Sequence, residues 1–301
     1  MVAFTPDYMI TLITIGTIYA LAATSLNFIT GYAGLVSIGH AAFLAVGAYT
    51  EAILLLKYNV PFEIAFPVSI LMGAILGALL GLPSLRVSDD FLAVATIGIN
   101  FIVVGALQFS DFFGGTLGLS VETPHVLGVA LEDTVFMGFA LAMLAIGMGV
   151  SWWLQRSWAG LALAALREDP QAAESVGIST ARFKIIAFTI SGAFAGMAGA
   201  LLAHYFGFIT PGTFGFLLSV DILVFAVFGG LGTIWGPVVG AYFLYILPQF
   251  LRTFQNYRVI LYGLVLMFII VVEPDGLMGL YRRASDWWSD RRAEPTTGET
   301  A

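Results

Sequence analysis

Long apolar segments alternate along the chain with short polar interruptions. Nine of these segments approach the roughly 20 residues that a helix needs to cross a bilayer. They lie near 8–28, 38–56, 62–82, 90–108, 133–154, 183–207, 216–232, 236–252 and 257–273. The pattern predicts an all-α, polytopic membrane helix bundle of about nine transmembrane helices, and counts of eight or ten remain open.

Composition supports a membrane protein and argues against several other kinds of protein and chemistry. The chain has 301 residues, of which 59% are hydrophobic and 10% are charged, against roughly 25% charged residues in soluble domains. It contains no cysteine, which excludes disulfides and thiol chemistry. The net charge of −7 comes from acids scattered over loops and tail, so it does not indicate a nucleic-acid partner. The first ten residues include no basic residue, so we expect a retained span and not a cleaved signal peptide.

One charged stretch, Gln155–Lys184, stands between two apolar segments. It holds seven charged residues, which are Arg156, Arg167, Glu168, Asp169, Glu174, Arg182 and Lys184. Its composition favours short helices that lie in water or against another protein, because such a segment cannot be hidden in lipid. Two interpretations follow, a solvated connector between spans and a docking helix for a cytoplasmic protein.

The distribution of Lys and Arg predicts the orientation. Arginines gather in the 155–182 loop and in the polar tail, 281–301, so both are expected in the cytoplasm. Counting back through nine spans places the N-terminus outside, together with the 109–132 loop, which has no Lys or Arg. Three basic residues, namely Lys57, Arg252 and Arg258, fall on the outer side and so depart from the rule that Lys and Arg gather in the cytoplasm.

Three glycine-rich clusters, 31–39, 113–118 and 229–236, interrupt the apolar runs. Non-helical backbone at membrane depth is tolerated only where it is packed in protein or lines a wet cavity. The first and third clusters therefore predict broken helices or tight turns inside the bundle, which serve close packing, a solute pathway or both. They are followed by similar sequences, HAAFLAVGAY and GPVVGAY, which suggest two related halves of the kind that transporters contain.

Isolated ionisable residues lie within the predicted spans, among them His40, His204 and Asp221. Such groups are candidates for solute or proton passage, and the alternative for each is a packed, hydrogen-bonded residue. The chain carries no HExxH, CxxC, GxSxG or Walker A sequence, so we expect no catalytic residues, no metal site and no ATP site of its own.

Six stretches, spread in order over most of the chain, are similar to the membrane permeases of ABC importers for branched-chain amino acids. The resemblance is to the LivM type and, more distantly, to its LivH-type partner. The stretches are GYAGLVSIGHAAFLAVGAYT (31–50), FGGTLGL (113–119), SWAGLALAALREDPQAAESVGI (157–178), SGAFAGMAGALLAHYFGFITP (191–211), VFGGLGTIWGPVVGA (227–241) and YRVILYGLVLMFIIVVEPDGLMG (257–279).

The resemblance implies that the charged loop contains a coupling helix, a short segment that fits a cleft on the ATPase and is often written EAAxxxG. Residues 171–177 reproduce the AAxxxG spacing, with Gln171 in the place of the glutamate. Pro170 suits a helix start and Gly177 a left-handed helix end. The residues expected to couple to the ATPase are Arg167, Glu168, Asp169, Gln171, Ala172, Ala173, Glu174 and Gly177.

The resemblance also implies a type II importer fold over residues 1–280 and a set of partners. These are a second, LivH-like permease, two cytoplasmic LivG/LivF-like ATPases that hold ATP and Mg²⁺, and a periplasmic or extracellular amino-acid-binding protein. This chain would bind no cofactor and would lie in a prokaryotic plasma membrane. The residues proposed for the pathway are Gly34, Ser37, Gly39, His40, Asp221, Gly230, Gly232 and Thr233.

Other functions remain as alternatives. Related permeases import urea or short amides. An ion-driven secondary transporter would carry carboxylates or arginines deep in several spans, and this chain has few. A structural membrane subunit would tolerate loss of the 171–177 spacing.

Overall fold

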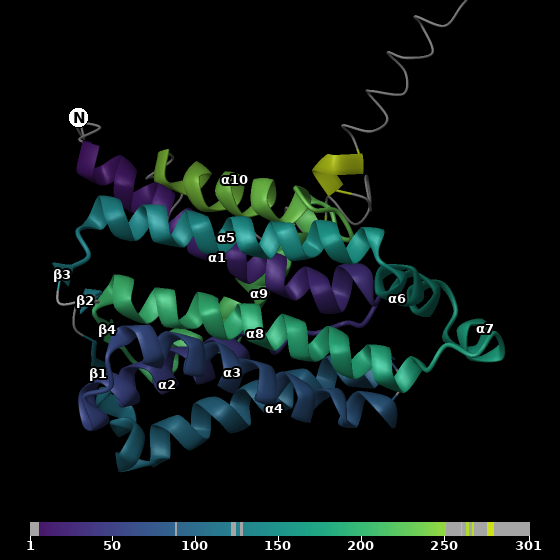
Figure 1. The fold of residues 1–301 in the computed structure, drawn as a ribbon, viewed down its shortest axis with the longest axis horizontal. Helices are drawn as coiled ribbons and strands as arrows, with labels where there is room; N and C mark the ends of the chain where they lie inside the picture. The colour runs from purple at the N-terminus through teal and green to yellow at the C-terminus, as the bar shows by residue number, and fades with distance from the viewer. Residues whose placement is uncertain are drawn as a thin grey trace, which may run out of the picture.

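The computed structural model describes residues 6–87, 89–121, 125, 126, 129–250, 260, 263, 264, 267 and 276–279. Helices dominate this part of the chain (Figure 1). The long helices are α1 (Pro6–Asn27), α2 (Ala41–Tyr58), α3 (Phe62–Gly81), α4 (Asp89–Phe109), α5 (Asp133–Arg156), α8 (Thr180–Phe206), α9 (Phe216–Gly229) and α10 (Gly236–Phe250). Two shorter helices, α6 (Trp158–Glu168) and α7 (Pro170–Ser175), connect α5 to α8.

Short elements complete the described chain. The π-helix η1 (Phe28–Tyr32) follows α1, and 3-10 turns occupy η2 (Pro83–Leu85), η3 (Asp111–Phe113), η4 (Gly115–Leu117) and η5 (Pro211–Phe214). The two-residue strands are β1 (Leu119–Ser120), β2 (His125–Val126), β3 (Val129–Ala130) and β4 (Phe208–Ile209). Strand β1 pairs with β4, and β2 with β3, both antiparallel.

Seven of the predicted spans correspond to helices that are long and apolar enough to cross a membrane. They cover Asp7–Tyr32, Ala41–Tyr58, Phe62–Leu85, Phe91–Phe109, Asp133–Arg156, Thr180–Phe206 and Pro211–Gly229. The eighth prediction corresponds to α10, whose segment Gly236–Ile246 is apolar but shorter. The ninth, 257–273, lies mostly outside the described residues, as does the 281–301 tail. The all-α, multi-pass membrane architecture is thereby confirmed.

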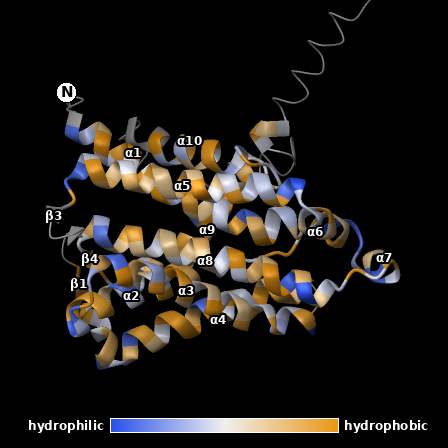
Figure 2. Ribbon diagram, viewed as in Figure 1, coloured by the Kyte–Doolittle hydropathy of each residue, from blue (hydrophilic) through white to orange (hydrophobic). Residues whose placement is uncertain are grey.

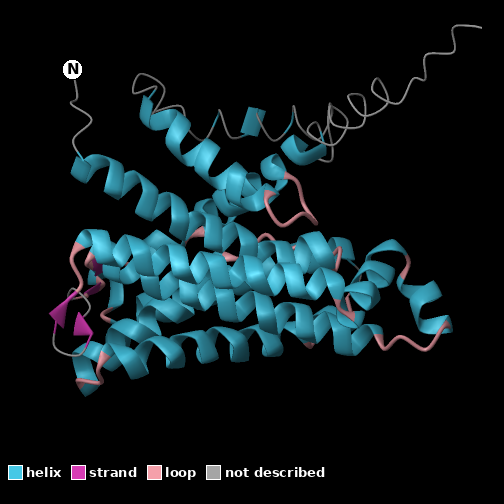
Figure 3. Cartoon of the chain, turned by 45° about the horizontal axis from the view of Figure 1, so that its top comes forward, coloured by secondary structure: helices cyan, strands magenta, loops and turns pink. Residues whose placement is uncertain are grey.

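The helices run between two ends of the bundle. Helices α6 and α7 stand at one end, called here the α7 end, and α7 projects beyond the other helices (Figure 1). The strands, the start of α1 and the loop after α4 lie at the other end, called here the strand end. Figure 2 shows apolar residues along the helices between these ends. Figure 3 shows the strands gathered at one end, with the turns placed mainly at the ends of the helices.

Helices α2, α3 and α8 pack closely because glycines face one another across them. A Cβ atom at Gly47 of α2 would overlap the backbone of Gly196 in α8. A Cβ at Gly196 would lie 2.8 Å from the carbonyl oxygen of Ser69 and 3.1 Å from the Cα of Gly73, both in α3. In a membrane, small residues of this kind allow the van der Waals contact on which helix association depends.

A buried polar cluster joins the same three helices. Glu51 Oε1 of α2 lies 3.1 Å from His204 Nε2 of α8, and both side chains are fully buried. Ser69 of α3 donates a hydrogen bond of 2.8 Å from its Oγ to Glu51 Oε2. Carboxylates inside membranes require such partners. Of the two interpretations considered for His204, the structure supports a packed, hydrogen-bonded residue.

The close packing of α3 and α8 can be tested by enlarging Gly196. We expect Gly196→Leu to lower the free energy of unfolding by about 1–3 kcal/mol, because the added atoms overpack the backbone of α3. The measurement is the thermal unfolding of the purified chain in detergent. Gly98→Leu in α4 is the matched control, since a Cβ there meets no atom of the described chain within 4 Å. Equal effects of both variants would contradict this account of the packing.

Candidate functional site

Two interrupted helices lie side by side near the α7 end, as the first and third glycine clusters predict. Helix α1 gives way to η1 at Phe28, and regular helix resumes only at Ala41. Helix α9 ends at Gly229, and α10 begins at Gly236. A π-helix is rare and is often found at functional sites. We call 28–40 the first break and 230–235 the second break.

Asn27 joins the two breaks through its carboxamide. Its Nδ2 donates a hydrogen bond of 2.9 Å to the carbonyl oxygen of Thr233, and its Oδ1 accepts one of 2.8 Å from the backbone N–H of Gly232. Interrupting a helix leaves backbone groups without intrahelical partners. Asn27, itself fully buried, therefore satisfies a donor and an acceptor of the second break from the end of α1.

The deeper part of the first break is enclosed by neighbouring helices. Ser37 and His40 are fully buried, and His40 Nε2 lies 2.7 Å from Ser25 Oγ in α1. The N–H of Ile38 donates to Thr96 Oγ1 in α4 at 3.0 Å, and Gly39 faces the backbone of that same threonine. Ser37 Oγ and His40 Nδ1 have no hydrogen-bond partner among the described residues. A role of Ser37, Gly39 or His40 in solute passage stays a prediction.

Thr233 stabilises the turn of the second break. Its Oγ1 donates a hydrogen bond of 2.8 Å to the carbonyl of Gly230 and accepts one of 3.0 Å from the N–H of Gly236 at the start of α10. Asp221 lies apart from this turn on α9 and is partly exposed. The residues predicted for a pathway therefore fall into three places: the turn of the second break, the enclosed first break, and α9.

The charged loop forms the two short helices α6 and α7. Helix α7 begins at Pro170 as predicted, and Gly177 has a φ of +85°, which is the left-handed conformation expected after its end. Asp169 Oδ1 accepts hydrogen bonds from the N–H groups of Gln171 and Ala172, at 2.8 and 3.0 Å. This is an N-cap, the preferred use of aspartate at a helix start.

Two further residues of the predicted coupling set hold the loop in shape. Ala173 is only 2% exposed, and its carbonyl accepts a hydrogen bond of 3.0 Å from the N–H of Ile178. Glu174 accepts a hydrogen bond from the hydroxyl of Thr180 at the start of α8. Apart from Ala173, every residue of the predicted coupling set is exposed, and Val176 beside them is 74% exposed.

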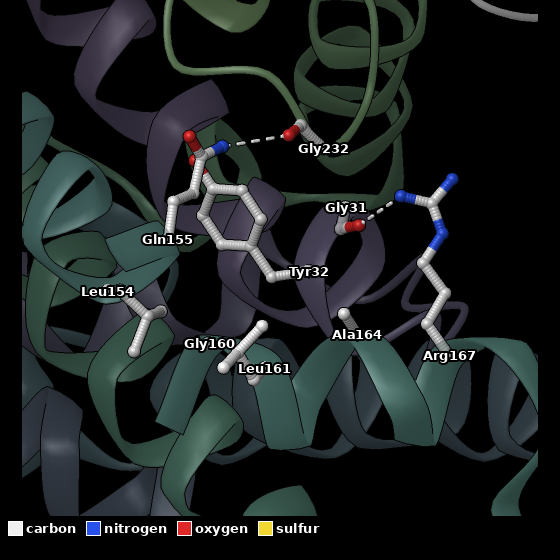
Figure 4. A pocket seen from close by; sticks show the side chains of 9 residues that line it. All are labelled: Gly31, Tyr32, Leu154, Gln155, Gly160, Leu161, Ala164, Arg167 and Gly232. Atoms are coloured by element: carbon white, nitrogen blue, oxygen red, sulfur yellow. Dashed lines mark hydrogen bonds between the residues drawn. The ribbon is translucent and has the colours of Figure 1, made fainter. Parts of the chain in front are cut away.

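Arg167 and Gln155 connect the loop to the two breaks (Figure 4). Arg167 Nη1 donates a hydrogen bond of 2.6 Å to the carbonyl of Gly31 in the first break. Gln155 Nε2, at the end of α5, donates one of 2.9 Å to the carbonyl of Gly232 in the second break. A cavity of about 190 Å³ lies beside them and is lined by Gly31, Tyr32, Leu154, Gln155, Gly160, Leu161, Ala164, Arg167 and Gly232.

The approach of Arg167 requires glycine at two positions of the breaks. Gly34 has a φ of +71°, and a Cβ there would lie 2.8 Å from Arg167 Cγ. Gly232 has a φ of +78°, and a Cβ there would lie 2.6 Å from Arg167 Nη1. Side chains other than glycine rarely adopt this conformation. These two glycines therefore shape the contact with the loop.

Sequence reasoning missed three residues that the structure connects to these features. Glu51 was detectable as an acid in the middle of the second predicted span, where an ionisable residue is a candidate by default. Asn27 lies at the end of the first predicted span, and Gln155 directly follows the fifth. No local signal indicates that they contact backbone some 200 and 77 residues away along the chain.

The kinds of chemical group present near the breaks limit what this region can bind. No three His, Cys, Asp or Glu side chains in the described part of the chain are grouped so that they could hold a metal ion. The polar groups of the two breaks instead include glycine backbone and serine, threonine and histidine side chains, with Asn27 adjoining them.

Comparison with known proteins identifies the family. The model of the family described as the permease component of branched-chain amino acid transport systems matches residues 8–270. The high-affinity branched-chain amino acid transport system permease protein LivM of Escherichia coli is 33% identical over 295 residues, covering 89% of this chain and 69% of that protein. The probable branched-chain amino acid transport permease protein LivH of Methanocaldococcus jannaschii is 26% identical, covering 85% of both chains.

The family match spans both helix breaks and the loop between α5 and α8. The breaks and the α6–α7 loop are thus found in a chain whose relatives are named as permeases. The chain belongs to the family of permease components of branched-chain amino acid transport systems.

Proposed function

We propose that this chain is a permease subunit of an ABC importer that carries branched-chain or other hydrophobic amino acids across a prokaryotic plasma membrane. The observation that carries the proposal is the family match over residues 8–270. The projecting helix α7 (Figure 1) also supports the proposal. A permease without an ATP site of its own needs a surface on which an ATPase can dock.

In this proposal the α7 end faces the cytoplasm and the strand end faces outward. A binding protein delivers the amino acid at the strand end. A second, LivH-like permease pairs with this chain, and the solute passes near the interface between the two. Two ATPases that bind ATP and Mg²⁺ supply the energy by favouring one of two conformations of the permease pair.

The surface of α7 suits docking into a cleft. The exposed Val176 offers apolar area at the tip of the loop, and the exposed Ala172 allows close approach. The Asp169 cap and the bond from Thr180 to Glu174 hold α7 in shape before any partner arrives, which reduces the entropy lost on binding. Gln171 takes the place of the family's glutamate, so the contact there would be a neutral hydrogen bond.

The relatives favour a branched-chain amino acid as the solute, and urea or a short amide is the alternative. The relatives are named for branched-chain amino acids, and the predicted pathway residues of the breaks are uncharged or histidine. An apolar side chain passes such a surface without needing a charged partner. Urea or a short amide would be equally compatible with the hydrogen-bonding groups present.

Docking can be tested at the exposed tip of the loop. We expect Val176→Arg to reduce the ATPase that co-purifies with the chain from native membranes by about tenfold or more, as for other interface residues of high energetic weight. Thr134→Arg, an exposed position at the strand end, is the matched control and should retain the ATPase. If the wild-type chain purifies with no ATPase at all, the importer proposal fails and ion-driven transport becomes the leading alternative.

Two substitutions of Asp169 distinguish helix capping from a charged contact with the ATPase. Asp169→Ala removes the cap of α7 at a cost of about 1 kcal/mol, which should weaken ATPase binding about fivefold. Asp169→Asn keeps a capping oxygen and should bind as the wild type does. Titration of the purified permease pair with ATPase measures both affinities. An equal loss in both variants would show instead that the carboxylate contacts the partner through its charge.

Substrate class is tested by competition. In proteoliposomes that hold the complete complex, uptake of labelled leucine should be inhibited by isoleucine and valine and unaffected by urea or acetamide. The reverse pattern would support the amide alternative. Omission of ATP or of the binding protein is the control and should abolish uptake.

A further inference from the structure

The end of the first broken helix depends on a residue of the loop. Helix α1 and its extension η1 end near Gly31, and the last carbonyls of a helix lack intrahelical donors. Arg167 supplies one of these donors at 2.6 Å. Its positive charge also faces the negative end of the helix dipole, which is the favourable arrangement. The loop thereby stabilises the position of the first break.

The second break is held to the same assembly. Asn27, the last residue of α1, bonds both Gly232 and Thr233, and Gln155 bonds Gly232 from α5. A displacement of the first break at Gly31 would therefore be felt at the second break through Asn27, only four residues away. Arg167 also lies directly against the second break, since a Cβ at Gly232 would meet its Nη1.

Helix α7 has little freedom to move without α6. Only Asp169 separates the two helices, and its side chain and backbone are both occupied, the first in the cap of α7 and the second in a bond from its N–H to the carbonyl of Ala165. Three residues on the inner face of α6, Ala162, Leu163 and Leu166, are buried against the bundle. A force applied to α7 is thus transmitted to α6 and to its last turn, which carries Arg167.

The cavity of about 190 Å³ beside Arg167 and Gln155 provides room for such a movement. Well-packed interiors resist small displacements, because their side chains leave few voids larger than a water molecule. Here Ala164 and Leu161 of α6 face open space next to the breaks (Figure 4). The hollow gives α6 room to shift on this side, while Arg167 at its end stays in contact with Gly34.

We infer that Arg167 is a positioning residue that transmits the movement of the α6–α7 loop to the two helix breaks, and so sets whether the α7 end of the pathway is open. This inference rests on the proposed function and replaces the expectation that Arg167 contacts the ATPase. An arginine suits this role because its planar guanidinium reaches the Gly31 carbonyl and presents further donors close to the backbone.

The test uses the complete complex in proteoliposomes and measures ATP hydrolysis and amino-acid uptake together. Arg167→Met keeps the length of the side chain and removes its donors. We expect it to retain its ATPases and their hydrolysis, while uptake per ATP hydrolysed falls about tenfold, within the usual range of coupling between sites. Arg182→Met, at an exposed arginine in the first turn of α8, is the matched control and should keep the wild-type ratio.

A second variant and a second readout keep the test independent of folding. Arg167→Lys retains one donor and should give a ratio between those of the wild type and Arg167→Met. In addition, because the chain has no cysteine, a single Ala164→Cys reports on the cavity. Its reaction rate with a soluble thiol reagent should change on addition of ATP and vanadate when Arg167 is present, and should stay constant in the Arg167→Met background.

Three results would overturn the inference. Loss of the ATPases from Arg167→Met would make Arg167 a docking contact and leave the proposed function intact. A wild-type ratio of uptake to hydrolysis in both Arg167 variants would show that Arg167 does not couple ATP hydrolysis to uptake. Absence of ATP-driven uptake by the wild-type complex would overturn the proposed function as well, and is recognised without any variant.

Discussion

A backbone N–H or C=O group cannot be left unsatisfied in lipid, so every interruption of a helix must find partners in the protein or in a water-filled cavity. This constraint governs the two breaks near the α7 end. Asn27 satisfies a donor and an acceptor of the second break, Thr233 closes its turn, and Arg167 bonds a carbonyl of the first. Regions that would otherwise be unstable are thereby held in one arrangement by few side chains.

The remainder of the bundle provides a rigid support for these breaks. Helices α2, α3 and α8 approach so closely at Gly47, Gly73 and Gly196 that a methyl group would not fit. The Glu51, Ser69 and His204 cluster adds polar contacts between the same helices. The region around Arg167 differs from these tightly packed helices, because a cavity lies beside the contacts between the loop and the breaks. Local movement in a transport cycle is expected where fewer apolar contacts are buried.

The loop between α5 and α8 has two sides with different tasks. Its outer tip, with Val176 and Ala172, is exposed and suits a partner. Its inner side, with Arg167 and the buried face of α6, contacts the interrupted helices. Asp169 stands between these sides and caps α7. In the proposed mechanism, the same short segment would receive a force from the ATPase at its tip and pass it on to the breaks.

The amino-acid pattern alone predicts the membrane class, seven long spans, the start of α10, the positions of both breaks and the start and end of α7. These features are local: apolar length, glycine clusters, proline and a left-handed glycine each act within a few residues. Three long-range features become visible only in the folded chain. Asn27 bonds the second break, Gln155 and Arg167 bond glycine carbonyls, and Glu51 contacts His204. Those partners are 77 to 206 residues apart along the chain, and their contacts depend on how helices pack, which no local pattern of residues specifies.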